Sequence, residues 1–221
     1  MDLLLPNVQW DLLLAATWET VYMMVISTFF TALFGLPLGI ALVVMEEKGL
    51  WPLPWLQRLV GFGVNLFRSI PFIVLVVWMI PVARMLVGTS LGPTAACVSL
   101  VVGAAPFYAR LVETSLREVD KGVIEAARAM GATRWQIIRK VYIPEALPGL
   151  VAGITVTCIT LVSYSAITGI LGGGGLGDLA YRFGFQSFQT DVMVLATAVL
   201  VLMVQIIQSI GDRVVQAIDK R

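Results

Sequence analysis

Five long apolar runs and one charged stretch make up the hydrophobic pattern of this chain. The runs lie at about 20–45, 59–80, 93–108, 147–171 and 192–210. A helix of about 20 apolar residues crosses a bilayer. The charged stretch, residues 119–144, follows three of the runs and precedes the other two. The pattern predicts an all-α integral membrane protein with five transmembrane helices in a single domain, 1–221.

The N-terminal segment does not have the pattern of a cleaved leader. It carries Asp2, Asp11 and Glu19 and no Lys or Arg, whereas a signal peptide has a basic start and a shorter apolar core. The run at 20–45 is therefore predicted to be the first transmembrane helix. Residues 1–18 are expected to form a short amphipathic helix outside the bilayer.

The second run contains a charge, Arg68, close to Pro71. Residues 70–83 alone are too few to cross about 30 Å of hydrocarbon at about 1.5 Å per residue. We therefore expect one helix over 59–80 that includes Arg68 at or inside the membrane boundary. Such an arginine either extends its side chain to the interface or lines a wet pathway, and the sequence leaves both open.

The third run, at 93–108, contains the small residues Gly103, Ala104 and Ala105, which let membrane helices pack closely. The fourth run is rich in hydroxyls, namely Thr155, Thr157, Thr160, Ser163, Ser165 and Thr168. Such hydroxyls either bond back to their own helix or line a polar path. The glycine-rich residues 172–177 lack the Lys-Ser/Thr pair of a phosphate-binding loop. They are expected to form a flexible re-entrant turn or hinge.

The charged stretch predicts two short helices that meet at a glycine. Asp120 can cap the first helix, and Gly131 suits the position just after its end. Thr133 and Gln136 have capping-box spacing, so a second helix is expected from Arg134 to about residue 142, closed by Pro144. This elbow could be a docking element or an amphipathic loop on the membrane surface.

Composition places the chain in a bilayer and removes several classes of chemistry. The 221 residues are 58% hydrophobic and 13% charged, against about a quarter charged in soluble domains. Histidine is absent, and Cys97 and Cys158 lie apart in apolar runs, so no Ser-His unit, metal site or disulfide framework is predicted. No basic cluster is interleaved with aromatics as in nucleic-acid-binding faces. We expect neither an enzyme nor a bound cofactor.

Basic residues predict the orientation, because Lys and Arg gather in cytoplasmic segments. With the N-terminus outside, only Arg84 and Arg182 would lie outside, and Arg68 falls within a run. The other basic residues would all be inside. They are Lys48, Arg58, Arg110, Arg117, Lys121, Arg128, Arg134, Arg139, Lys140, Arg213, Lys220 and Arg221. The charged stretch and the C-terminus are therefore expected in the cytoplasm.

The source of energy is expected to lie outside this chain. Ion-driven carriers usually place carboxylates within their spans, and here every Asp and Glu falls in a predicted loop, tail or span end. No nucleotide-binding motif is present either. Five helices are few to enclose a pathway, which favours a homodimer with the pathway on its two-fold axis.

The charged stretch also resembles a known signature. Glu125-Ala126-Ala127, three residues, Gly131, nine residues and the end Val141-Tyr142-Ile143-Pro144 are similar to the EAA motif of permease subunits of bacterial ABC importers. The resemblance implies a type I ABC importer permease fold in which this segment is a coupling helix on a separate ATPase. The residues implied in ATPase coupling are Glu125, Ala126, Ala127, Arg128, Ala129, Met130 and Gly131.

Longer runs resemble the methionine-importing branch of these permeases. They are residues 67–72, 78–81, 87–90, 103–107, 125–133, 144–149, 164–166 and 173–177. The resemblance implies two copies of the chain, two ATPases that bind the ATP, an external substrate-binding protein, methionine as substrate and the bacterial cytoplasmic membrane. The translocation path is expected at Tyr164, Ser165, Ile167, Thr168 and Arg68, and the dimer contact on the fourth and fifth spans. Ile167 stands where the family pattern has methionine.

Three other functions remain open from the sequence. One is an ABC permease for another amino acid, since the external binding protein can determine specificity. Another is a membrane scaffold that recruits a partner through the same elbow. The third is an ion-coupled carrier, which the lack of carboxylates within the predicted spans disfavours.

Overall fold

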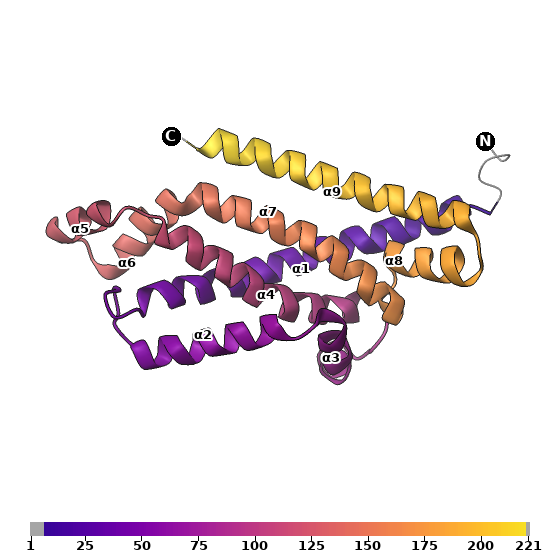
Figure 1. Cartoon of the computed structure of the whole chain (residues 1–221), viewed down its shortest axis with the longest axis horizontal. Coiled ribbons are helices and arrows are strands. Elements are labelled where there is room, and N and C mark those ends of the chain that lie inside the picture. The colour runs from indigo at the N-terminus through magenta and orange to yellow at the C-terminus, as the bar shows by residue number, and fades with distance from the viewer. Residues whose placement is uncertain (1–6, 220–221) are drawn as a thin grey trace.

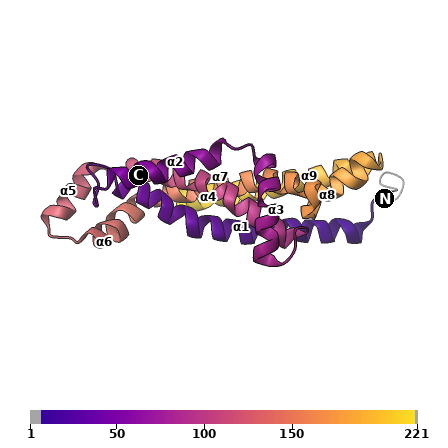
Figure 2. The same cartoon turned by 90° about the horizontal axis from the view of Figure 1, so that it is seen from below.

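The computed structural model describes residues 7–219 as an elongated bundle of helices, with no strand among these residues (Figure 1). Four long helices follow the long axis: α1 (Trp10–Val44), α4 (Pro93–Arg117), α7 (Ile143–Thr168) and α9 (Thr190–Ile218). Helices α1, α4 and α7 pack together at the centre, and α9 lies along one side. Figure 2 shows that the bundle is flattened and that α5 and α6 project at one end.

The centre of the bundle is closely packed because small residues line the contact between α1 and α4. A Cβ on Gly39 would lie 2.6 Å from the Ala109 carbonyl oxygen, so only glycine lets these helices approach this far. Met23, Leu100 and Leu161, from α1, α4 and α7, are fully buried in one core cluster farther along the same helices. Within the predicted small-residue run of α4, Ala104 and Ala105 are buried, and a Cβ on Gly35 of α1 would lie 2.9 Å from the Ala105 carbonyl oxygen, so close packing of this run is confirmed.

Four helical stretches are long and apolar enough to cross a membrane: Trp10–Val44, Pro93–Arg117, Arg134–Gly173 and Thr190–Ile218. The helices α2 (Pro54–Ser69) and α3 (Phe72–Val87) pass the same test only together. They would make a fifth crossing if the bent pair counts as one span. The all-α architecture with four or five apolar spans agrees with the prediction.

The second span is not the single helix expected over 59–80. The chain bends by 108° between α2 and α3, and Ile70 has the extended backbone of a residue before proline, with φ −75° and ψ 125°. Proline disfavours helical geometry in the residue before it, and its ring nitrogen has no hydrogen to donate. Helix α3 continues to Val87, so residues 88–92 alone link it to α4, whereas the predicted runs 59–80 and 93–108 left residues 81–92 between them.

Two other boundaries differ from the prediction. Residues 10–18 belong to the continuous helix α1 and not to a separate helix, while residues 1–6 lie outside the described residues. Pro144 does not end the second elbow helix, because a π-helical turn, Ile138–Tyr142, joins it directly to α7. Pro144 lies in the first turn of α7, where the lack of an N–H costs little.

The two ends of the bundle differ, and we name them here. The elbow end carries α5 (Lys121–Ala129), α6 (Arg134–Ile137) and the loop 45–53. The glycine end carries the turn at 169–174, the short helix α8 (Gly175–Leu179) and the π-helical segment Ala180–Gln186. The chain enters α1 at the glycine end, and α9 finishes near the elbow end.

The glycine run forms a turn that is packed against α1. The amide of Gly175 donates to Glu19 Oε2 at 2.7 Å, and the amide of Leu176 donates to Thr20 Oγ1 at 2.9 Å. Leu176 itself is fully buried. These contacts fix the start of α8, and of the two expected alternatives, a re-entrant turn or a hinge, the structure shows a turn at 169–174.

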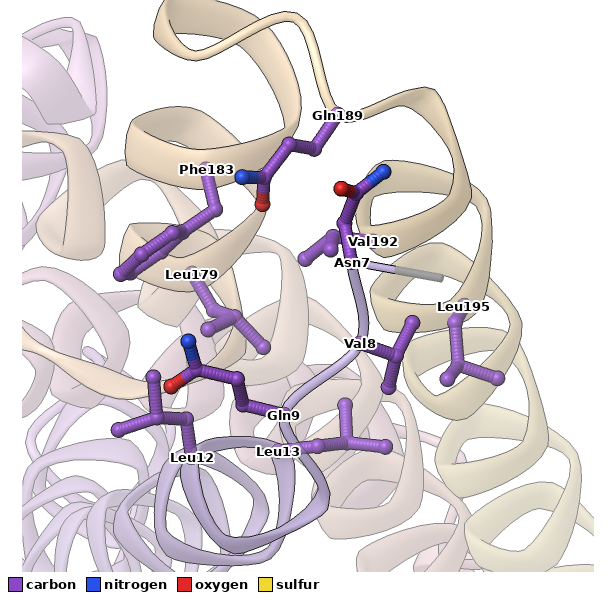
Figure 3. Close-up of a pocket in the computed structure, with 10 residues that line it drawn as sticks. All are labelled: Asn7, Val8, Gln9, Leu12, Leu13, Leu179, Phe183, Gln189, Val192 and Leu195. Carbon is purple, nitrogen blue, oxygen red and sulfur yellow. The ribbon is translucent and has the colours of Figure 1, made fainter. Parts of the chain in front are cut away.

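A second contact at the glycine end joins the start of the described chain to α9. The backbone N–H and the side-chain amide of Asn7 both donate to the Asp191 carboxylate, at 3.0 to 3.3 Å. Asn7 and Gln189 lie at the mouth of a mostly apolar crevice that Leu13, Leu179 and others line (Figure 3). Its volume, about 10 Å³, is that of a single water, so this crevice is too small for an organic substrate.

Candidate functional site

The elbow has the local structure that the sequence predicts. The Asp120 side chain accepts a hydrogen bond from the Gly122 amide, and Asp120 thereby caps α5. Thr133 and Gln136 form a reciprocal capping box that starts α6. Gly131, between the helices, has φ +77° with open space where a Cβ would be. This conformation strains other residues, so glycine sets the angle of the elbow.

One face of the elbow packs on the bundle and the other is exposed. Ile124, Ala127 and Ile137 are buried against the core. Glu125, Ala126, Arg128, Ala129, Met130 and Gly131 are exposed. Met130 is 82% exposed, unusual for a large apolar side chain, and Trp135 is 70% exposed. An apolar tip of this kind, with charges beside it, is suited to a partner surface. Of the residues predicted to dock, Ala127 alone faces inward.

The elbow rests on the loop 45–53, which connects α1 and α2. Arg128 Nη2 donates to the Gly49 carbonyl at 3.5 Å. The Arg134 guanidinium lies 5.9 Å from the ring centre of Trp51, a cation–π distance. Trp51 and Trp135 meet edge to face at 5.9 Å between ring centres. Two arginines and a tryptophan of the elbow therefore contact this loop.

A buried carboxylate lies beside this loop. Glu113, in α4, is 3% exposed and forms ion pairs with Arg110 and, at 2.7 Å, with Arg117. Arg117 also reaches Glu46 of the loop at 2.7 Å. Arg110 continues the network toward α2, donating to Asn65 Oδ1 at 2.8 Å. We call these five residues the charged network.

The charged network was not predicted from the sequence. Every carboxylate was expected in a loop, tail or span end, but α4 continues to Arg117 and Glu113 is buried within it. The spacing of Arg110, Glu113 and Arg117 is the signal that could have found the network, because residues three and four apart share one helix face. The links to Glu46 and Asn65 are long-range contacts without a local pattern.

The residues predicted for a translocation path lie near the break between α2 and α3 or on α7. Arg68 is exposed in the last turn of α2. Tyr164 and Ile167 are partly buried on α7, and Ser165 and Thr168 are buried. The hydroxyls of Ser165 and Thr168 donate to carbonyls of their own helix at 2.7 and 2.8 Å.

An aromatic stack joins α7 to the start of α3. The rings of Phe72 and Tyr164 lie nearly parallel, at 6°, with their centres 3.8 Å apart. A Cβ on Gly103 of α4 would lie 3.0 Å from the Phe72 ring, so the ring is enclosed between α4 and Tyr164. The stack places the break in direct contact with the predicted path residue Tyr164.

A family model decides which class of membrane protein this is. The model described as binding-protein-dependent transport system inner membrane component matches residues 35–221. The chain belongs to this family. As a member of it, the chain is an inner-membrane component of a transport system, which agrees with its apolar spans.

Curated relatives align with most or nearly all of this chain. The probable D-methionine transport system permease protein MetI of Vibrio cholerae is 51% identical over 96% of this chain and 94% of its own length. The methionine import system permease protein MetP of Bacillus subtilis is 50% identical over 98% and 97%. The D-methionine transport system permease protein MetI of Escherichia coli is 56% identical over 72% and 73%.

Solved structures of transporter chains agree with the fold. A chain of the MetNI methionine ABC transporter in inward facing conformations is 51% identical, with a TM-score of 0.93 over 95% of this chain and 97% of that one. An amino acid ABC transporter crystallised with histidines is 18% identical with a TM-score of 0.75. The second match shows the shared type I importer fold alone.

Proposed function

We propose that this chain is the permease subunit of an ATP-driven methionine importer in the bacterial cytoplasmic membrane. The observation that carries the proposal is the exposed elbow on a fold that matches a methionine transporter chain with a TM-score of 0.93. Relatives named as methionine permeases align over nearly the whole chain at about half identity. The subunit itself is not an enzyme, and its task is to open and close a path.

The transporter consists of two copies of this chain, two ATPase subunits and an external substrate-binding protein. ATP binds to the ATPases, so this chain holds no cofactor. The N-terminus lies outside and the C-terminus in the cytoplasm. This orientation is supported by basic residues at the elbow end, including Arg128, Arg134, Arg139 and Lys140, and by the opposite ends at which α1 begins and α9 finishes.

The elbow docks on the ATPase through residues 125–131. Glu125 and Arg128 provide charges around a small-residue surface, Met130 provides an apolar tip, and Gly131 sets the angle. The path passes the end of α2 at Arg68 and the face of α7 at Tyr164 and Ile167. Ser165 and Thr168 keep their hydroxyls on their own helix, so they shape this face through their small size.

Substitution of Gly131 tests the docking surface. Gly131→Leu is expected to abolish co-purification with the ATPase while membrane insertion stays intact, because a bulky side chain meets the ATPase and strains a φ of +77°. The matched control is Gly88→Leu. Gly88 has φ +79° and open space around its Cβ, so it incurs the same strain away from the elbow. Normal ATPase co-purification of Gly131→Leu would refute the assignment.

The transport activity is tested by uptake of labelled methionine into proteoliposomes that contain this chain, its ATPase and its binding protein. We expect uptake only with ATP inside, competed by unlabelled methionine and not by arginine or glutamate. ATP-dependent uptake of other amino acids alone would keep the permease and exclude methionine. Uptake that follows an imposed ion gradient without ATP would refute the proposal.

A further inference from the structure

The charged network lies between the elbow and α2, two parts of the chain that an ATP-driven permease must move together. We propose that Glu113 is a positioning residue that couples the ATPase-docking elbow to α2 during transport. The inference rests on the proposed function, because it concerns how movement at the docking surface reaches the path. It is carried by a continuous set of contacts.

The first contacts join the elbow to Glu46. Arg128 and Arg134 hold the loop at Gly49 and Trp51. Within the loop, the Gly49 amide donates to the Glu46 carbonyl at 2.9 Å, and the Trp51 amide donates to the Val44 carbonyl at 2.8 Å. These backbone bonds make the loop a tight turn, so a displacement of the elbow carries Glu46 with it.

The next contacts cross α4 through one carboxylate. Glu113 pairs with Arg117 through one oxygen and with Arg110 through the other. Because Glu113 is buried, water does not readily replace either guanidinium. Glu46 and Glu113 balance the two arginines, so the pairs can exchange partners without leaving an excess charge in the core.

The last contacts fix α2, which has little apolar packing of its own. Within α2, all of which the structure describes, Gly61 and Val64 alone are buried. Arg110 donates both to Asn65 Oδ1 at 2.8 Å and to the Gly61 carbonyl at 3.5 Å. The polar link to Arg110 therefore sets where α2 lies on α4.

Helix α2 ends at the break, and the Phe72–Tyr164 stack lies just beyond it. A shift of α2 thus reaches the face of α7 that we assign to the path. Without Glu113, the elbow could still dock and the ATPase could still turn over. The movement would then no longer be delivered to α2.

The test is the number of methionine molecules imported per ATP hydrolysed by the complete transporter in proteoliposomes. For Glu113→Gln we expect nearly normal ATP hydrolysis and an import-to-ATP ratio about ten-fold lower, a typical size for coupling between sites. The matched control is Asp178→Asn. It breaks an Arg182–Asp178 pair with the same i,i+4 spacing at the glycine end and should leave the ratio unchanged.

Asn65 supplies a second test that does not disturb a buried charge, in case Glu113→Gln fails to assemble. Asn65 is exposed, so Asn65→Ala should assemble normally yet lower the ratio about three-fold. Asn65→Asp keeps an oxygen that accepts from Arg110, so its import-to-ATP ratio should equal that of the unsubstituted transporter.

An unchanged ratio in Asn65→Ala or in assembled Glu113→Gln would overturn the proposal. So would a fall in import that matches the fall in ATP hydrolysis, because a purely structural role predicts that result. If the unsubstituted transporter shows no ATP-dependent methionine import, the proposed function itself fails, and this outcome is seen before any variant is compared.

Discussion

The elbow end and the glycine end of the bundle are held together by different kinds of contact. At the elbow end, polar side chains link separate elements, with Arg117 of α4 paired to Glu46 of the loop 45–53 and Arg110 of α4 donating to Asn65 of α2. At the glycine end, backbone amides of α8 donate to Glu19 and Thr20 of α1. Charged side chains can exchange partners during a movement, whereas backbone amides at a helix start cannot.

Close packing reinforces this difference. A Cβ on Gly177 of α8 would lie 2.4 Å from the Ala166 Cα of α7, so two backbones touch at the glycine end. Around Gly131 of the elbow, a Cβ would meet nothing within 4 Å. The comparison indicates that backbone contacts hold the glycine end, whereas the tip of the elbow at Gly131 has room for a partner.

The largest loss of stability is expected from a larger side chain at Gly177, in the tightly packed glycine end. Gly177→Ala places a methyl group on the α7 backbone, which cannot yield cheaply, and should lower the free energy of unfolding by about 3 kcal/mol or more. The measurement is thermal unfolding of the detergent-purified protein. The matched control is Gly63→Ala in α2, where a Cβ meets nothing within 4 Å. It should be neutral or stabilise by about 0.5 kcal/mol. Equal effects of the two would contradict a tightly packed glycine end.

A smaller effect is expected from removing one side-chain acceptor at the same end. Thr20→Val keeps the shape of a fully buried side chain but leaves the Leu176 amide unpaired, which should cost about 2 kcal/mol. Thr17→Val is the control. Thr20 donates to the Ala16 carbonyl of its own helix, and Thr17 likewise donates to the Leu13 carbonyl, so Thr17→Val should change stability by about 0.5 kcal/mol. If Thr20→Val and Thr17→Val lower the free energy of unfolding equally, the hydrogen bond from the Leu176 amide to Thr20 does not stabilise the glycine end.

The smallest effect on stability is expected at the exposed edge of the charged network. Glu46→Gln removes an ion pair whose side chains are 37% and 53% exposed, and should cost less than about 1 kcal/mol. The difference from wild type should shrink further in high salt. Glu47→Gln, one residue along the chain and outside the network, is the control. A loss as large as that of Thr20→Val would show that the elbow end is as rigid as the glycine end.

Features that depend on residues close together in the chain could be predicted from the sequence, and features that depend on long-range contacts could not. The elbow was predicted well because its signals are local, namely the Asp120 cap, the Thr133–Gln136 box and Gly131. The contacts of Glu19 and Thr20 with α8 join residues 156 apart in the chain, and no local pattern marks them. The break was missed because apolar residues continue across it, although Pro71 disfavours a helix at Ile70.

The same difference between local and long-range contacts explains which site residues were predicted from the sequence and which were not. Six of the seven elbow residues lie on the exposed face, because Ile124 and Ala127, three apart on α5, pack on the core and turn the other residues outward. Glu113 was assigned to a loop since the apolar run stops before it, yet α4 continues past it and buries it. Helix length beyond an apolar run depends on neighbours such as α1 and α7, which the run itself does not reveal.

The break between α2 and α3 also bears on how the chain enters the membrane as it is synthesised. Each of these helices has 16 residues, or about 24 Å at about 1.5 Å per residue. Neither reaches across about 30 Å of hydrocarbon alone. Helix α2 also carries Arg58, Asn65 and Arg68, which oppose its transfer to lipid as an isolated segment. Membrane insertion is therefore expected to take the two helices together, as one bent unit of 108°, before α2 packs against α4.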